Sequence, residues 1–162
     1  MNWMKAENTA VVTGAAGGIG LEAAKRFAAA DMNIVLVDVK ADLLEDAAAQ
    51  LSGGAGAVKT KVCDVSDATA MKALSAEIEA EFGDVHCLMN NAGIGRMGTK
   101  PWEDLDAFNG LVSINLMGVI HGCHAFMPAM LAHGEPGVVI NTGSTQGITR
   151  PPGNYAYKLS KA

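Results

Sequence analysis

The sequence predicts an α/β fold with a doubly wound parallel sheet and helices on both of its faces. Apolar runs of strand length alternate five times with helical runs, about one pair per 32 residues, close to the ~30 residues of a βαβ unit. The run 34–37 is apolar without alternation, which is typical of a strand buried on both faces. With 162 residues, 49% apolar and 18% charged, the chain is expected to form one domain over 1–162.

The individual elements follow from these patterns. The expected strands are 9–13, 34–37, 57–62, 85–89 and one that starts at 138. Helices are expected over 18–30 and 41–51, and then from a cap at Ser66 to Phe82, where Gly83 ends the run. Pro101 opens a longer helical region, with room for a break, that ends near Ala132. A last helix is expected to start at Asn154.

The long helical region carries many apolar side chains. They include Leu111, Val112, Ile114, Leu116, Val119 and Ile120. A surface helix keeps its apolar residues on one stripe, so this region is expected to be buried.

Charge and composition exclude several classes of protein. The net charge is −5, which argues against a sequence-independent nucleic-acid binder, because such proteins need a basic face. No window approaches the ~20 apolar residues of a membrane span, and residues 1–7 lack the apolar core of a signal peptide. The three cysteines form no CxxC pair and are expected to be core residues in a reducing cytoplasm. His121 and His124 have no further ligand set beside them, so no metal is expected.

A glycine-rich turn stands between the first strand and the first helix. It reads Thr13-Gly14-Ala15-Ala16-Gly17-Gly18-Ile19-Gly20. Strand, glycine turn and helix is the arrangement that holds a dinucleotide pyrophosphate in Rossmann-type sheets. Glycine is needed where φ is positive or where a Cβ would block the phosphates, and the helix offers free N–H groups to the anion. The predicted cofactor contacts of this turn are Gly14, Gly17, Gly18, Ile19 and Gly20.

Asp38 ends the second strand, 18 residues beyond Gly20, and Val39 follows it. In a doubly wound sheet this position lies beside the glycine turn, where a carboxylate accepts both ribose hydroxyls and repels a 2′-phosphate. A surface carboxylate at a strand end is the alternative. Together with the turn, Asp38 predicts a site for NAD, with NADP less favoured, and the uncharged Ala15 and Ala16 agree, although Lys40 offers a positive charge close by. Val39 is expected to be a further cofactor contact.

Two further strand ends supply polar groups to the same edge of the sheet. Asp64 and Val65 follow the third strand, where the carboxylate could bind an adenine amino group or serve as a cap or turn for the next helix. Asn91, Ala92 and Gly93 follow the fourth strand, and their small side chains allow close approach to a ribose. An ordinary Asn-Gly turn is the alternative for this second segment.

With these residues in place, the chain resembles the short-chain dehydrogenase/reductase family, in its single-domain branch. Four motifs match in order: TGxxxGIG at 13–20, Asp-Val at 64–65, NNAG at 90–93 and YxxxK at 157–161. The resemblance implies hydride transfer between NAD and an alcohol or carbonyl substrate. It also implies a catalytic set of Asn115, Ser144, Tyr157 and Lys161, with Tyr157 and Lys161 contacting the cofactor as well.

The roles of these four residues follow the chemistry of their side chains. Tyr157 and Lys161 are spaced i,i+4 and share a helix face, whereas Tyr155 would meet Leu159. A nearby ammonium favours the phenolate, so Tyr157 is expected to act as general acid and base, while Lys161 holds the nicotinamide ribose as its family counterpart does. Ser144, ahead of Thr142 and Thr145, is expected to hydrogen-bond the substrate oxygen.

Asn115 lies among apolar residues of the long helical region. By resemblance it supports a proton-relay water, and an amide satisfied within the core is the alternative. The segments 94–98 and 145–153 are expected to border the substrate pocket, with Gln146 and Arg96 as the best polar candidates beside Ser144 and Tyr157.

The chain ends one residue past Lys161, whereas the family continues through a further strand and a substrate lid. We therefore expect a C-terminally incomplete domain, with the fifth strand as an apolar edge and a last helix of barely two turns. The full-length parent is expected to be a homodimer or homotetramer. A nucleotide-binding fragment or sensor subunit without turnover is the alternative function, and an epimerase of the extended branch is less favoured.

Overall fold

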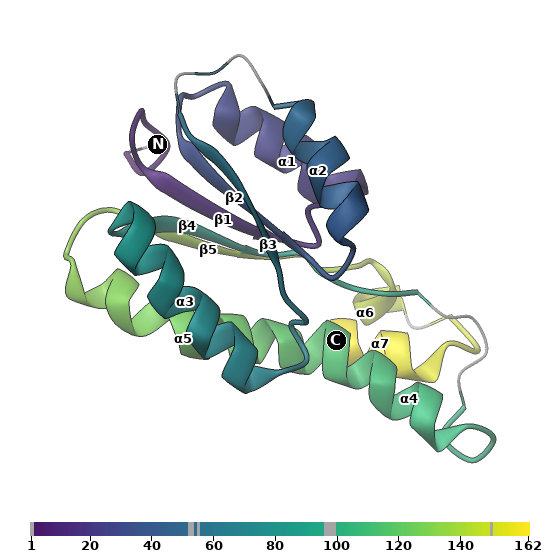
Figure 1. Ribbon diagram of the computed structural model, residues 1–162. Helices are drawn as coiled ribbons and strands as arrows, with labels where there is room; N and C mark the ends of the chain where they lie inside the picture. Colours follow the sequence, from purple (N-terminus) through teal and green to yellow (C-terminus); the bar gives the residue numbers. More distant parts are fainter. Residues whose placement is uncertain (1, 52–53, 55, 96–99, 150) are drawn as a thin grey trace.

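The computed structural model describes residues 2–51, 54, 56–95, 100–149 and 151–162, and it contains one parallel sheet (Figure 1). The five strands are β1 (Thr9–Thr13), β2 (Asn33–Asp38), β3 (Val58–Val62), β4 (Val85–Asn90) and β5 (Val138–Asn141). Their order across the sheet is β3-β2-β1-β4-β5, and every neighbouring pair is parallel. The predicted fold class is confirmed. The polar residues Thr13, Asp38 and Asn90, each the last of its strand, lie together at the carboxyl ends of the parallel strands.

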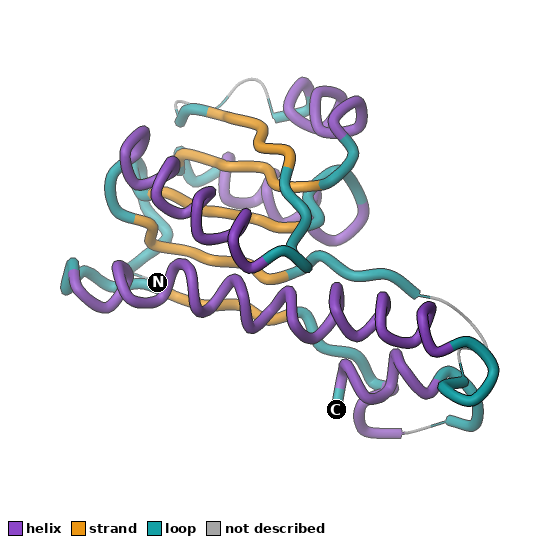
Figure 2. Tube along the Cα trace, turned by 60° about the horizontal axis from the view of Figure 1, so that its bottom comes forward, coloured by secondary structure: helices purple, strands orange, loops and turns teal. Residues whose placement is uncertain are grey.

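Helices cover both faces of this sheet. One face carries α1 (Gly18–Ala28) and α2 (Ala41–Ala49), and the other carries α3 (Ala68–Phe82) and α5 (Gly118–Ala132) (Figure 1). The remaining helical elements are α4 (Leu105–Val112), the π-helical segment η1 (Ser113–Met117), α6 (Gln146–Thr149) and α7 (Tyr155–Lys161). Figure 2 shows α4, η1 and α5 as one continuous run, so the long helical region has no break between Leu105 and Ala132.

The core consists of two apolar clusters, one on each side of the sheet. Ala10 and Val12 of β1 belong to the cluster beneath α1 and α2, and Val11 belongs to the cluster beneath α3 and α5. All five residues of β1 are buried. This is the reason for the continuous apolar runs in the sequence, because a central strand has no solvent-facing side.

A bulge interrupts the pairing of β1 with β4 near the start of both strands. Thr9 pairs with Val85 and Ala10 pairs with Cys87, so His86 is the extra residue. Val85 consequently packs in one cluster and Cys87 in the other. The backbone N–H of Thr9 donates to Nδ1 of His86 at 3.3 Å, which satisfies a donor that the bulge leaves unpaired.

Two helix starts differ from the sequence prediction. The cap of α3 is Asp67, not Ser66: its carboxylate accepts from the N–H groups of Thr69 and Ala70 at 2.8 and 3.0 Å. Ser66 instead donates its hydroxyl and its N–H to Asp64. The α4 helix begins at Leu105 after a cap at Asp104, because residues 101–103 form a turn, so the prediction that Pro101 opens a helix was wrong.

The long helical run is less buried than its composition predicted. Leu111 is fully buried, but Ile120 is 47% exposed and Val119 is only half-buried. This run, Leu105–Ala132, is the one part of the described chain that is long and apolar enough to cross a membrane by length and composition alone. From the sequence, no stretch is expected to approach the apolar length of a membrane span, so this run differs from that expectation. In the fold its α5 part lies against β4 and α3 and its α4 part packs against α7, and the core helix of a globular domain passes the same test.

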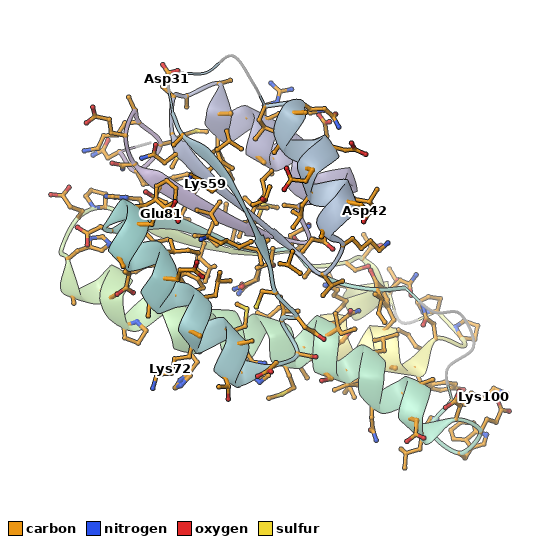
Figure 3. All side chains as sticks on the ribbon, in the orientation of Figure 1. Asp31, Asp42, Lys59, Lys72, Glu81 and Lys100 are labelled. Atoms are coloured by element: carbon orange, nitrogen blue, oxygen red, sulfur yellow. The ribbon has the colours of Figure 1, made fainter. Side chains whose placement is uncertain are left out.

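Ion pairs connect α3 with the outer strand β3. Lys59 of β3 contacts Glu81 of α3 at 3.0 Å, and the two side chains lie close together in Figure 3. Lys61 reaches both Glu77 at 2.7 Å and Glu81 at 3.0 Å. These hydrogen-bonded carboxylates raise the pKa of Lys61. At the opposite edge, β5 pairs with β4 alone within the described sheet, as the sequence predicted.

Candidate functional site

The glycine turn between β1 and α1 has three geometric requirements. Gly14 and Gly18 adopt positive φ angles of 65° and 55°, which other residues rarely adopt. A Cβ on Gly20 would collide with the carbonyl oxygen of Gly14, so the turn closes tightly onto the helix. A Cβ on Gly17 would meet nothing within 4 Å. The surface at Gly17 is therefore open, as an approaching phosphate requires.

Asp38 lies beside this turn. Its Oδ2 accepts from the backbone N–H of Ala16 at 3.2 Å, and its Oδ1 accepts from the N–H of Lys40 at 3.2 Å. Ala15 donates to the carbonyl of Val37 at 3.1 Å, which ties the turn to the end of β2. Val39 is 56% exposed next to the carboxylate. An acidic acceptor and an exposed apolar side chain thus share the position where the sequence predicts the ribose contacts.

Asn91 lies directly beneath the turn. Its Nδ2 donates to the carbonyl oxygens of Thr13 at 3.1 Å and Gly14 at 3.2 Å. The hydroxyl of Thr13 accepts from the N–H groups of Asn91 and Ala92 at 3.0 and 3.1 Å. A Cβ on Gly14 would lie 2.7 Å from the Cα of Ala92. These contacts explain why an Asn and small residues follow β4.

A cavity of about 830 Å³ runs along this edge of the sheet. Ligand sites of proteins typically occupy about 300–1,000 Å³. Predicted site residues that line the cavity are Gly14, Gly17, Ile19, Asp38, Val39, Asp64, Val65, Asn91, Ala92, Gly93, Gln146, Tyr157 and Lys161. Gly18, Gly20, Asn115 and Ser144 are not in its lining. The size of the cavity, the open surface at Gly17 and the carboxylate of Asp38 fit an extended dinucleotide with its pyrophosphate at the turn.

Asp64 forms the turn that was one of the two interpretations of its sequence position, and its contact with an adenine amino group stays a prediction. Its Oδ1 accepts from the N–H of Ser66 at 2.9 Å and from the hydroxyl of Ser66 at 2.8 Å, which makes a turn before α3. The side chain is exposed and lines the cavity. Neighbouring Cys63 also lines the cavity, and burial raises the pKa of its thiol.

Tyr157 and Lys161 lie on one side of α7 and both line the cavity. Tyr155 faces away from it: its ring lies 5.4 Å from that of Trp102, and the ammonium of Lys158 lies 4.7 Å above it. The Nζ of Lys161 donates to the carbonyl oxygen of Thr142 at 2.8 Å. Burial removes water from the ammonium and lowers the pKa of Lys161. The carbonyl of Thr142 supplies one of the hydrogen bonds that water would otherwise make.

Ser144 lies in the segment that joins β5 to α6, and Gln146 is the first residue of α6. Ser144 is half-buried, and its hydroxyl oxygen accepts from the N–H of Gln146 at 3.2 Å. The Oε1 of Gln146 accepts from Nδ2 of Asn154 at 3.4 Å. The structure thus brings Gln146 to the cavity, whereas Ser144 is not among the residues of its lining. Arg96, the other polar candidate for the substrate pocket, lies outside the described residues.

Asn115 is 1% exposed at the centre of the π-helical segment η1. Its Oδ1 accepts from the N–H of Ile94 at 2.8 Å, and its Nδ2 donates to the carbonyl of Ile94 at 2.9 Å. Nδ2 also lies 3.4 Å from the hydroxyl of Ser160 on α7. The amide is therefore satisfied within the core, and it fixes the segment after β4 against the helix of Tyr157 and Lys161. π-Helical segments often occur at functional sites.

Sequence reasoning missed several residues of the cavity wall. They are Leu43, Cys63, Ile114, Gly143 and Asn154, whereas Lys40, Ile94 and Gly95 were named beside the expected site and Thr142 was ranked below Ser144. Thr142 follows β5 directly, so its position at a carboxyl strand end was an available signal. Asn154 was not recognisable in this way, because it reaches the cavity through a left-handed backbone with φ of 52°. Among the described residues, no cluster of three His, Cys, Asp or Glu side chains could hold a metal ion.

Comparison with known proteins agrees with this geometry. The profile of the family described as short chain dehydrogenase matches residues 8–162. The chain is 39% identical over 154 residues to galactitol 2-dehydrogenase (L-tagatose-forming) of Cereibacter sphaeroides, which covers 94% of this chain and 59% of that protein. It is 36% identical over 151 residues to the probable oxidoreductase EphD of Mycobacterium tuberculosis, which covers 93% of this chain and 26% of that protein.

A solved structure gives the same result in three dimensions. The crystal structure of a short chain dehydrogenase/reductase from Burkholderia phymatum, in complex with NAD, matches with a TM-score of 0.92 at 34% identity. The match covers 99% of this chain and 57% of that one. The chain therefore spans between a quarter and three fifths of the length of these relatives.

Proposed function

Since the chain belongs to the short-chain dehydrogenase/reductase family, we propose that the protein is an NAD(H)-dependent oxidoreductase acting on an alcohol or carbonyl substrate. The observation that carries this proposal is the single cavity that the glycine turn, Asp38, Tyr157 and Lys161 all line. The residues proposed to bind the dinucleotide and those proposed to transfer the proton therefore line the same cavity.

Asp38 supports NAD rather than NADP as the cofactor. Its carboxylate lies at the turn with both oxygens held by backbone N–H groups, so it stays oriented as an acceptor for ribose hydroxyls. A 2′-phosphate at this point would meet the negative charge. The related structure from Burkholderia phymatum contains NAD, which agrees with this choice.

The chemistry divides between cofactor and protein. NAD(H) supplies hydride transfer at C4 of the nicotinamide. Tyr157 is proposed to take the proton from the substrate hydroxyl during oxidation and to return it during reduction. Lys161 is proposed to hold the nicotinamide ribose with its ammonium group. Ser144 is proposed to donate its hydroxyl hydrogen to the substrate oxygen, while its oxygen continues to accept from the N–H of Gln146. Asn115 holds the surrounding segments and is proposed to support the proton relay.

The substrate is proposed to be a small alcohol or its carbonyl counterpart, with Gln146 as a polar contact at the cavity wall. Galactitol 2-dehydrogenase, by its name, acts on such a molecule. The whole protein is proposed to act in the cytoplasm as a homodimer or homotetramer. Exposed apolar side chains along the long helical run support self-association, among them Leu105, Met117, Ile120, Met127 and Leu131.

Titration of the purified chain with NADH and NADPH, followed by nucleotide fluorescence, tests the cofactor assignment. We expect NADH to bind more tightly than NADPH, and Asp38→Asn to weaken NADH binding by about tenfold while narrowing the difference from NADPH. Tighter binding of NADPH by the unaltered chain would contradict the NAD assignment. Binding of NADH without turnover on any alcohol or carbonyl would favour a nucleotide-binding module instead.

The acid–base assignment has a matched control on the same helix. Tyr157→Phe removes the proposed proton carrier, and we expect kcat to fall by about 10²- to 10⁴-fold in the full-length protein. Tyr155→Phe retains the ring beside Trp102 and should leave kcat within about twofold. Equal losses in both variants, or a loss under about tenfold for Tyr157→Phe, would exclude the proposed role.

A further inference from the structure

A continuous set of hydrogen bonds connects the glycine turn to Lys161. The carbonyl oxygen of Gly14 accepts from Nδ2 of Asn91 at 3.2 Å. The Oδ1 of Asn91 accepts from the hydroxyl of Thr142 at 3.1 Å. The carbonyl oxygen of Thr142 accepts from Nζ of Lys161 at 2.8 Å. All four residues line the cavity, so this chain of contacts spans it from the turn to α7.

The direction of each bond is fixed by its surroundings. Nδ2 of Asn91 faces two carbonyl oxygens, those of Thr13 and Gly14, and therefore must be the donor end of the amide. The opposite end is an acceptor, so the Thr142 hydroxyl donates to it. The N–H of Thr142 donates to the carbonyl of Asn90 at 3.0 Å, which extends the pairing of β4 and β5 beyond the last strand residue.

The packing around Asn91 leaves its amide little room to move. A Cβ on Gly20 would lie 2.7 Å from Nδ2 of Asn91, so the amide packs closely against the start of α1. A displacement of Asn91 would therefore displace the turn. Thr142 is the residue through which this constraint reaches Lys161, because one of its groups contacts Asn91 and another contacts the ammonium.

We propose that Thr142 is a positioning residue that couples the diphosphate-binding turn to Lys161. A diphosphate on the turn holds Gly14 and Asn91 in place, Asn91 holds the Thr142 hydroxyl, and the Thr142 carbonyl holds the Lys161 ammonium for its part in proton transfer. Coupling of this kind is reciprocal, so the lysine end also affects binding at the turn. The inference rests on the proposed function for the identity of the diphosphate.

Nucleotide fragments separate the two ends of this chain of contacts. ADP carries the diphosphate but no nicotinamide ribose, and adenosine carries neither. Thr142→Val replaces the hydroxyl by a methyl group and leaves Oδ1 of Asn91 without its donor, whereas Thr142→Ser retains the hydroxyl. By calorimetry on the chain, Thr142→Val should weaken ADP and NAD about five- to tenfold and leave adenosine unchanged. Thr142→Ser should bind all three within about twofold of the unaltered chain.

The lysine end is measured by NMR. The ε-methylene signal of Lys161 is identified by its loss in Lys161→Met. ADP should shift this signal in the unaltered chain and in Thr142→Ser, although ADP lacks the ribose that Lys161 is proposed to bind. In Thr142→Val the signal should no longer respond to saturating ADP.

Each other outcome overturns the proposal in a different way. Weaker binding of NAD with unchanged binding of ADP would mean that Thr142 contacts the nicotinamide half directly. Weaker binding of adenosine as well would mean a general loss of structure. An undiminished ADP response of Lys161 in Thr142→Val would mean that the ammonium senses charge through space. Absence of nucleotide binding by the unaltered chain would refute the proposed function itself, before any variant is compared, and the coupling with it.

Discussion

Two glycines of the turn between β1 and α1 differ in what a methyl group would meet. At Gly17 the backbone is extended, with φ of 177°, and the space beyond it is open. At Gly20 a methyl group would overlap the Gly14 carbonyl and approach Asn91. The sequence motif treats both as parts of one pattern. The geometry separates a glycine that leaves room for a ligand from a glycine that lets the protein close on itself.

Alanine substitutions should separate these two roles. Gly17→Ala should leave the melting temperature nearly unchanged and weaken NAD binding at least tenfold, because the methyl group would stand where the pyrophosphate is proposed to bind. Gly20→Ala should lower the free energy of unfolding by about 1–3 kcal/mol, because the ~1 kcal/mol that Ala gains in a helix does not offset the overlap. Thermal unfolding and NAD titration measure both effects. A destabilised Gly17→Ala that binds NAD normally would contradict the assignment.

At the scale of elements, the alternation of apolar runs was sufficient to predict the sheet, because a parallel strand buried on both faces has no other sequence pattern. The strand bounds lie within about one residue of those predicted. Helix starts were harder. Ser66 and Asp67 are both good caps, and only the contact of Ser66 with Asp64 decides between them. That contact depends on how the chain leaves β3.

The same reasoning applies to the candidate site. Asp38, Tyr157 and Lys161 could be predicted because their positions follow from strand ends and helix spacing. Thr142 could be placed at a strand end, but its bonds to Asn91 and Lys161 depend on the order of β1, β4 and β5 in space. The separation of Ser144 from the cavity wall likewise depends on α6, a four-residue helix with no distinct sequence signal.

The cap of α3 gives a prediction for a single element. Asp67→Ala removes the acceptor of two backbone N–H groups and should lower the free energy of unfolding by about 0.5–2 kcal/mol. Ser66→Ala keeps this cap and should cost clearly less. Urea denaturation of the two variants checks the order. A larger loss in Ser66→Ala would restore Ser66 as the residue that starts the helix.

In the whole molecule, a second polar arrangement lies near the amino-terminal end of β4, away from the cavity at the carboxyl ends of the strands. The rings of His86 and His133 lie 5.3 Å apart, and the charges of Asp84 and Lys5 also affect the pKa of His86. Nδ1 of His86 accepts from Thr9, and Nδ1 of His133 accepts from the N–H of Glu135 at 3.0 Å. The ring of His86 is therefore neutral in the fold, since a protonated ring has no acceptor.

This arrangement predicts that the fold loses stability in mild acid. Burial, and secondly the neighbouring His133, lower the pKa of His86. Below the ordinary histidine pKa of about 6.5, the unfolded chain binds a proton that the folded chain does not, so stability falls as the pH drops from about 7.5 toward 5.5. His86→Gln keeps an acceptor for Thr9 without the titration and should flatten this dependence in urea denaturation. His124→Gln, at an exposed position on α5, should retain it. The same acid loss in His86→Gln as in the unaltered chain would assign the effect to other groups.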